Sequence, residues 1–405
     1  MKPAGTTLLL CLACASAGAA GDVAVRGETV YTMAGAPLKD GVVIVRGGRI
    51  ERVGPSAGVV IPAGLRVLTA KVVTPGLVDA HSVVGLSGYL NQAHDQDQIE
   101  RSAPVQPELR AVDGYDPHER LVEWVRRFGV TTLHTGHGPG ALISGQTMVV
   151  KTRGATVEAA TVVPVAMVAA TLGESARGVE GKSPGNRAKM VAMLRGELVA
   201  AQEYARKREA PDKDKEPARS LKLDMLVRVL KGELPLLVTA HRARDILSAL
   251  RVASEFGIKV VLDGAAEAHM VKDEIKRAGV PVIVHPTMAR SNGETENLSF
   301  ETAGQLRAAG IPVALQSGFE GYVPKTRVLL FEAAVAAANG LGLEGALTAS
   351  TLDAARILGL GARLGSLEVG KDGDLALYDG DPFEYTTHCV GVVIDGDVVH
   401  EGPDS

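Results

Sequence analysis

Several side chains that could bind a metal or transfer a proton stand at the ends of short apolar runs. His81 closes KVVTPGLVDAH, His134 closes VTTLH, His241 closes PLLVTAH, and His285 closes PVIVH. Asp263 closes a similar run, KVVLD, and it lies midway along the chain between His241 and His285. Imidazole nitrogens are zinc ligands, and a carboxylate can accept a proton from an attacking water. One possibility is a nitrogen-rich metal site, provided that the runs end at one place.

The runs themselves predict the elements that would bring these side chains together. PLLVTAH (235–241), KVVLDG (259–264), PVIVHP (281–286) and PVALQSG (312–318) have strand length, and helix-length segments follow them. This alternation is typical of parallel strands buried on both faces. We therefore predict an α/β fold with a (β/α)8 TIM-type barrel over residues 72–363. In such barrels the active site lies at the C-terminal ends of the strands.

Both ends of the chain outside the barrel predict short strands around glycine-containing turns. VVIVRGGRIERVG (42–54) has the pattern of a hairpin turning at Gly47-Gly48. DLALYDGD (374–381) and VGVVIDGDVVHE (390–401) have a similar pattern at the other end. Neither set alone closes a core, and chain termini commonly lie close together. We expect one small β-sandwich domain, its first half at 22–71 and its second half at 364–405.

The most specific stretch is KVVTPGLVDAHS (71–82), which resembles the first barrel strand of the amidohydrolase superfamily. LGSLEVGKDGDLALYDGDPF (364–383) extends the resemblance over nearly the whole chain after residue 20. VTAHRARDI (238–246) and LDGAAEAHMV (262–271) are similar to the imidazolonepropionase-like branch. The resemblance implies a hydrolase that opens cyclic amides or related C–N bonds with metal-activated water.

Several metal positions of that family are altered here. Its His-x-His pair becomes His81-Ser82-Val83, and valine cannot bind a metal. The fifth-strand histidine is present as His241. The sixth-strand histidine would fall near Gly264, and the eighth-strand aspartate, which binds metal and takes the proton from water, would fall on Gly318.

Other residues could replace part of the altered site. We expect a divalent metal, zinc by preference, held by His81 and His241 with His134 and His285 as substitutes. Asp263 is the candidate catalytic proton acceptor, although strand alternation could turn its side chain away from the barrel mouth. We therefore expect His241→Ala to affect activity more than Asp263→Asn does. No other cofactor is expected, since GHGPGALISG lacks the lysine of a phosphate loop.

Two functions are compatible with this pattern. The first is an exported, metal-dependent hydrolase of C–N bonds other than linear peptide bonds, acting on a small molecule. The second is a catalytically inactive amidohydrolase-fold protein that serves as a binding module or structural partner. The family resemblance also implies a homo-oligomer or an assembly with a related amidohydrolase. The metal content of the purified protein distinguishes the two functions.

Composition and the N-terminal segment restrict location and partners. The 405 residues are 46% hydrophobic with a net charge of −4, which gives no positive field for nucleic acid. Lys2, the apolar stretch 8–15 and the small residues 17–19 predict a signal peptide over 1–20, hence a periplasmic or secreted protein. A lipoprotein anchored through Cys14 is the alternative. No later stretch predicts a membrane span. Signal cleavage would leave only Cys389, so no internal disulfide is expected.

Overall fold

The computed structural model describes residues 21–178, 181–210, 216–285, 291–318 and 329–402. The predicted signal peptide, residues 1–20, lies outside these described residues. Within them, no helix combines the length and the apolar character that crossing a membrane requires.

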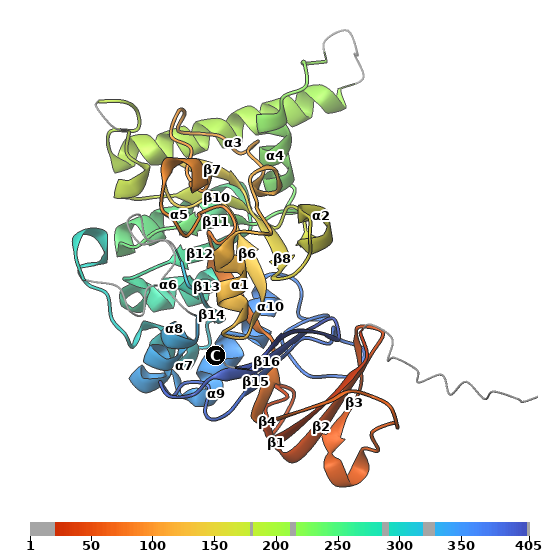
Figure 1. Cartoon of the computed structure of the whole chain (residues 1–405). Coiled ribbons are helices and arrows are strands. Elements are labelled where there is room, and N and C mark those ends of the chain that lie inside the picture. Colours follow the sequence, from red (N-terminus) through yellow and green to blue (C-terminus); the bar gives the residue numbers. More distant parts are fainter. Residues whose placement is uncertain (1–20, 179–180, 211–215, 286–290, 319–328, 403–405) are drawn as a thin grey trace, which may run out of the picture.

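The central body is a barrel with its helices on the outside (Figure 1). Its parallel strands are β5 (Leu77–Ser82), β6 (Val130–Thr135), β10 (Val168–Thr171), β11 (Leu236–Thr239), β12 (Val260–Gly264), β13 (Val282–Val284) and β14 (Val313–Leu315). β5 pairs with β6, and β10 to β14 pair in sequence order. A parallel bridge joins Ser82 of β5 to Gly318, three residues after the end of β14, and closes the ring.

One member of the ring runs in the opposite direction, contrary to the expected all-parallel barrel. β7 (Ile143–Gln146) and β8 (Met148–Lys151) are consecutive; β8 pairs antiparallel with β6, and β7 pairs antiparallel with β10. The glycine-rich segment HGPG (137–140) after β6 turns the chain directly back instead of leading into a crossover helix. β9 (Thr161–Val163) adds to β8 outside the ring.

The barrel interior changes from apolar to polar toward the C-terminal ends of its strands. Leu237, Val261, Ile283 and Ala314 form a buried interior cluster. Residues two positions further along a strand point to the same face. The interior therefore ends in a layer of Thr239, Asp263, His285 and Gln316, all of which line one cavity.

Helices cover the outside of the barrel. They are α1 (Arg120–Arg126), α2 (Val157–Ala160), α3 (Arg187–Glu209), α4 (Leu221–Leu230), α5 (Ala243–Phe256), α6 (Lys272–Ala278), α7 (Thr302–Ala308), α8 (Leu329–Ala336), α9 (Leu343–Ala349) and α10 (Leu352–Ile357). α5 begins directly after His241-Arg242, and Gly257 ends it in the left-handed conformation with φ of 65°. Alanine and leucine dominate α8 and α9, which pack against β14.

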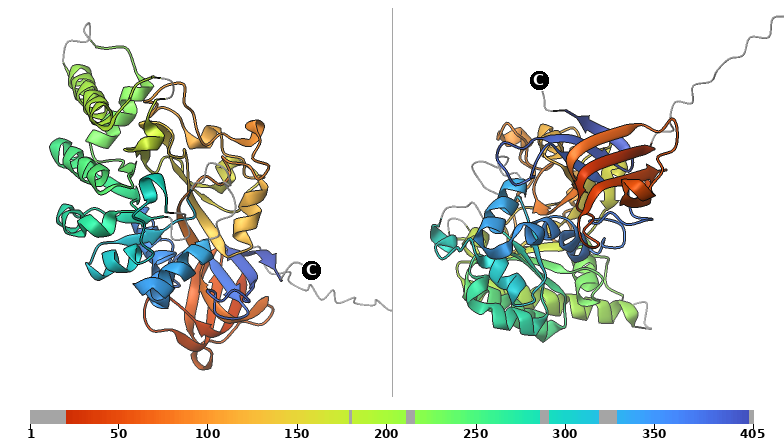
Figure 2. Two further views of the ribbon diagram at one scale, coloured as in Figure 1. Left: turned by 90° about the vertical axis from the view of Figure 1, so that its left-hand side faces the viewer. Right: turned by 90° about the horizontal axis from the view of Figure 1, so that it is seen from below.

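Strands from both chain ends form one seven-stranded sheet beside the barrel. β1 (Val23–Val30), β2 (Leu38–Arg46), β3 (Arg49–Pro55) and β4 (Val67–Pro75) meet β15 (Leu375–Tyr378), β16 (Cys389–Ile394) and β17 (Asp397–Glu401). The two segments join where β4 pairs antiparallel with β15. Figure 2 shows the red and dark blue strands together at one end of the molecule. The pairing runs through all seven strands as one sheet, and an isolated bridge between Arg49 of β3 and Asp372, just before β15, brings its two halves together.

Candidate active site

A small cavity lies at the C-terminal ends of β5, β11, β12, β13 and β14, the end at which barrel enzymes carry their active sites. Its volume is about 40 Å³, which is room for a water molecule or an ion. Its lining residues are His81, Ser82, Val83, Pro139, Thr239, His241, Asp263, Gly264, His285, Gln316 and Gly318. The structure thus brings His81, His241, His285 and Asp263 to one cavity.

His81 and Asp263 form a buried pair across this cavity. The His81 Nδ1 atom lies 2.9 Å from an Asp263 carboxylate oxygen, and both side chains are almost completely buried. The carboxylate also accepts hydrogen bonds from Thr239 Oγ1 at 2.6 Å and Gln316 Nε2 at 2.8 Å. With Nδ1 engaged, His81 Nε2 is buried and has no hydrogen-bond partner among the described residues.

The electrostatics of the pair favour its charged forms. Burial raises the pKa of Asp263, but the His81 charge and the hydrogen bonds outweigh burial and hold this pKa below its usual value. Burial lowers the pKa of His81, yet the Asp263 charge and hydrogen bond outweigh it and raise the pKa above 6.5. The possibility that Asp263 turns away from the mouth is wrong. Asp263 follows the inward-facing Val261 by two residues and therefore shares its direction.

His241 and His285 each lie against a glycine in a left-handed conformation. A Cβ atom at Gly264, where φ is 73°, would come within 2.6 Å of His241 Cε1. A Cβ atom at Gly318, where φ is 72°, would come within 2.5 Å of His285 Nε2. The imidazoles therefore occupy space next to Gly264 and Gly318, the two positions at which the family resemblance implies metal ligands. Burial lowers the pKa of His241 to about 4, and its Nδ1 has no hydrogen-bond partner within the described chain.

His134 lies behind this arrangement and does not line the cavity. Its Nδ1 lies 2.6 Å from the Ala80 carbonyl oxygen, and its Nε2 lies 2.6 Å from Thr147 Oγ1. The reversed direction of β7 and β8 brings Thr147 to this place. Its ring centroid is 5.5 Å from that of His81, and burial lowers its pKa to about 3. Both ring nitrogens are engaged, so the geometry does not favour His134 as a metal ligand.

Sequence reasoning missed two buried carboxylates near the cavity. Asp79 accepts hydrogen bonds from the backbone N–H and the hydroxyl of Ser317, and burial raises its pKa to about 6. Glu332 of α8 is 1% exposed and lies 4.0 Å from His285 Nδ1. Glu332 could have been found from the sequence, because it is the one charged residue within LLFEAAVA.

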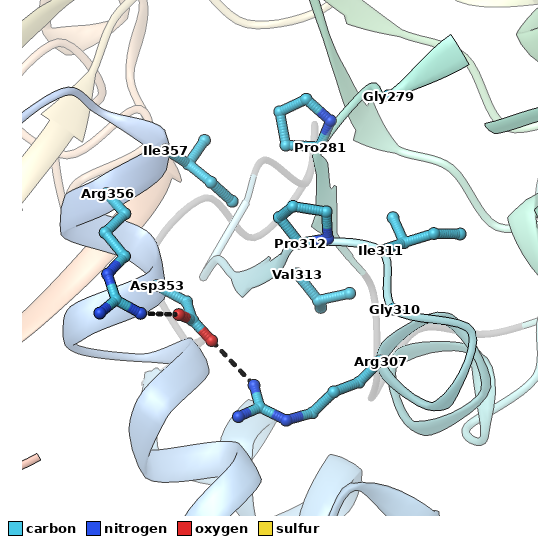
Figure 3. Close-up of a pocket in the computed structure, with 10 residues that line it drawn as sticks. All are labelled: Gly279, Pro281, Arg307, Gly310, Ile311, Pro312, Val313, Asp353, Arg356 and Ile357. Atoms are coloured by element: carbon cyan, nitrogen blue, oxygen red, sulfur yellow. Dashed lines mark hydrogen bonds and ion pairs between the residues drawn. The ribbon is translucent and has the colours of Figure 1, made fainter. Parts of the chain in front are cut away.

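A second, larger cleft lies at the opposite, N-terminal ends of β13 and β14 (Figure 3). Its volume is about 680 Å³, and Pro281 and Pro312 form part of its wall. Its charged side chains pair with each other: Asp353 lies 2.8 Å from Arg307 and 3.2 Å from Arg356. This end of a barrel normally serves stability, and none of the predicted site residues lines this cleft.

The comparisons with known proteins agree with this architecture. The profile of the amidohydrolase family matches residues 304–400. An amidohydrolase from Thermotoga maritima MSB8 is 30% identical; the match covers 94% of this chain and all of that one, with a TM-score of 0.87. The chain belongs to the amidohydrolase family.

Relatives of known name place this amidohydrolase in the imidazolonepropionase-like branch. Imidazolonepropionase from Rhizorhabdus wittichii is 27% identical over 87% of this chain and 92% of its own length. Amidohydrolase tasK from Hapsidospora irregularis is 24% identical, and the match spans only 36% of that longer protein. A zinc-bound adenosine deaminase from Xanthomonas campestris, 17% identical with a TM-score of 0.55, shares the fold over 95% of this chain.

Proposed function

We propose that this amidohydrolase hydrolyses a C–N bond other than a linear peptide bond, such as that of a cyclic amide, in a small molecule. The supporting observation is the state of His81, whose side chain lines the shared cavity. Its Nδ1 is hydrogen-bonded to Asp263, while its Nε2 is buried and has no hydrogen-bond partner among the described residues. Metal-binding histidines commonly donate their second nitrogen to a carboxylate in this way. The proposed ion is zinc, with His81, His241 and His285 as its ligands.

The donor chemistry of the cavity fits such an ion. His81 Nε2 and His241 Nδ1 are buried without hydrogen-bond partners among the described residues, a costly state that coordination would relieve. Within the described ranges, no three His, Cys, Asp or Glu side chains are already gathered around one point. The residues that would hold the ion are the three imidazoles that line the cavity, those of His81, His241 and His285. When bound, zinc would polarise the scissile carbonyl and lower the pKa of water.

The residues of the chain then have distinct roles. Asp263 fixes the tautomer of His81, and Thr239 and Gln316 hold the Asp263 carboxylate in place. Because these bonds keep the Asp263 pKa low, the carboxylate is a weak base. Asp263 therefore serves as a positioning residue, in place of the proton acceptor that its sequence position indicated.

The hydrogen bonds that Asp263 accepts also favour a second candidate function, ion or partner binding without catalysis. A cavity whose carboxylate already accepts three hydrogen bonds can bind an ion without activating water efficiently. A binding module or structural partner of a related amidohydrolase would need nothing more. Assembly as a homo-oligomer or with such a relative is part of this proposal.

Metal analysis followed by an activity assay tests the proposal. Protein purified without chelators is expected to contain about one zinc per chain, and His241→Ala is expected to lose most of it. Asp263→Asn is expected to weaken binding less, by about 10- to 100-fold, because Asp263 acts through a ligand. Turnover of cyclic amides that stops with zinc removal supports the hydrolase. Bound zinc without turnover supports the binding function, and zinc-free protein refutes the metal site.

We also propose that the chain is exported with cleavage near residue 20, on the strength of its N-terminal sequence. Fractionation of cells that produce the full chain, with N-terminal sequencing of the product, tests this. A processed N-terminus in the periplasm or medium is expected. An intact Met1 terminus in the cytosol would contradict export.

A further inference from the structure

Glu332 is a buried acid in an otherwise apolar helix. α8 reads LLFEAAVA, and Leu329, Leu330, Ala333 and Ala336 are buried with the Glu332 side chain, which is 1% exposed. Burying a carboxylate without compensating partners costs several kcal/mol, so such residues are rare unless paired or functional. Groups of opposite polarity close to Glu332 are therefore expected to stabilise its charge.

His285 is such a partner. Glu332 Oε1 lies 4.0 Å from His285 Nδ1, which is within ion-pair distance but longer than a hydrogen bond, and both side chains are buried. On its other side, the His285 ring lies over Gly318, where an added Cβ would come within 2.5 Å of Nε2. Gly318 lines the cavity. Nδ1 is thus directed to the helix outside the barrel, and Nε2 is directed to the cavity end.

The pair of His285 and Glu332 resembles the pair of His81 and Asp263. In each case a buried carboxylate lies beside one ring nitrogen of an imidazole that lines the cavity. Asp263 comes from a barrel strand, whereas Glu332 comes from a helix that packs on β14. Two such carboxylates would balance the double positive charge of a zinc ion in a buried site.

We propose that Glu332 is the positioning residue of His285. Its negative charge beside Nδ1 favours the tautomer with the proton on that atom, which leaves the lone pair on Nε2, and α8 thereby supplies the negative charge that position 318 lacks. This inference rests on the proposed function for the ion that His285 would bind. The assignment of Glu332 itself rests on the burial and pairing described above.

The test compares Glu332→Gln, Glu332→Asp and the exposed control Glu344→Gln for zinc affinity, measured by competition with a chromophoric chelator. Glu332→Gln keeps the size of the side chain and removes its charge. We expect zinc to bind about 10- to 100-fold more weakly to this variant. Glu332→Asp is expected to recover part of the loss, and Glu344→Gln to match the unchanged protein. Equal affinities for Glu332→Gln and Glu344→Gln would overturn the inference.

A second measurement uses the unchanged protein and so does not depend on whether a variant folds. Nitrogen NMR of the zinc-free, unchanged protein reports which nitrogen of the His285 ring carries the proton. We expect Nδ1 to be protonated, and an unprotonated Nδ1 would overturn the role of Glu332. The NMR measurement separates the proposed zinc site from the proposed role of Glu332. If the unchanged protein binds no zinc, the metal site is refuted, but the protonation of the His285 ring still tests the role of Glu332.

Discussion

Lys151, the last residue of the reversed strand β8, forms a buried ion pair with Asp374, which directly precedes β15 of the terminal sheet. The Lys151 ammonium also lies 3.2 Å from Asp372 and 3.2 Å from Asp395. The carboxylates outweigh burial and raise the Lys151 pKa above 10.5. This one cation therefore joins the barrel to the sheet formed by both chain ends.

Replacing Lys151 with methionine is expected to destabilise the protein by about 3 to 5 kcal/mol, because buried carboxylates lose their cation. Urea unfolding at neutral pH measures the change. Lys231→Met is the control, since Lys231 forms an exposed pair with Glu209. That control is expected to cost less than about 1 kcal/mol. Similar losses for both variants would show that Lys151 does not join the two parts.

Gly318→Ala tests the contact with His285. Gly318 and Gly310 both have positive φ, 72° and 80°, but an added Cβ meets His285 at position 318 and open space at position 310. Alanine at either position therefore strains the backbone, but only alanine at position 318 also contacts the His285 ring. Gly318→Ala is expected to cost about 1 to 3 kcal/mol more than Gly310→Ala in denaturant unfolding. Equal costs would indicate that the ring moves aside freely.

His134 predicts a pH dependence of stability in the metal-free protein. Burial lowers the pKa of His134 in the folded chain to about 3, against an ordinary value of 6.5 for an exposed histidine. The unfolded chain therefore binds the proton first, and stability falls as pH drops below 6.5 toward 3. Between pH 6.5 and 5 the contribution is about 1.5 kcal/mol.

The comparison with His134→Gln isolates this contribution. Other groups shift stability in the opposite direction; the folded pKa of Asp79, for example, is raised to about 6. Their effects cancel when the free energy of unfolding is compared between the two proteins at each pH. The variant is expected to be less stable at neutral pH and to lose less on acidification. Parallel pH profiles would contradict the burial of a neutral His134.

Deleting residues 364–405 is expected to leave poorly soluble protein. β4 pairs with β15 in the complete chain, so the deletion exposes the edge of β4 and the apolar face of the sheet. The measurement compares the soluble fraction and the melting temperature with those of the full chain. A soluble truncated protein with an unchanged melting temperature would refute the joint sheet.

The positions of His81, His241 and His285 could be predicted because apolar runs of strand length precede them. Parallel strands place such ends at one mouth of a barrel, and all three imidazoles line one cavity. The distant segments 22–71 and 364–405 were also expected to meet, since each presents too few strands for a core of its own. β4 and β15 form that contact.

Other features required the three-dimensional structure. The reversal of β7 and β8 depends on a glycine-rich turn whose direction the sequence pattern does not specify, and this reversal engages His134 through Thr147. The inward direction of Asp263 depends on a register that a one-residue difference would invert. Glu332 reaches His285 from a helix, a tertiary contact that strand periodicity cannot predict.

The contacts of Gly264 with His241 and of Gly318 with His285 constrain how this chain could be redesigned. A larger side chain at position 318 requires the ring at 285 to leave, and the same dependence links positions 264 and 241. Effects of changes at touching positions are not additive. A library that aims to restore an aspartate at 318 must therefore vary 285 in the same round, because stepwise mutants would pass through a crowded and less stable intermediate.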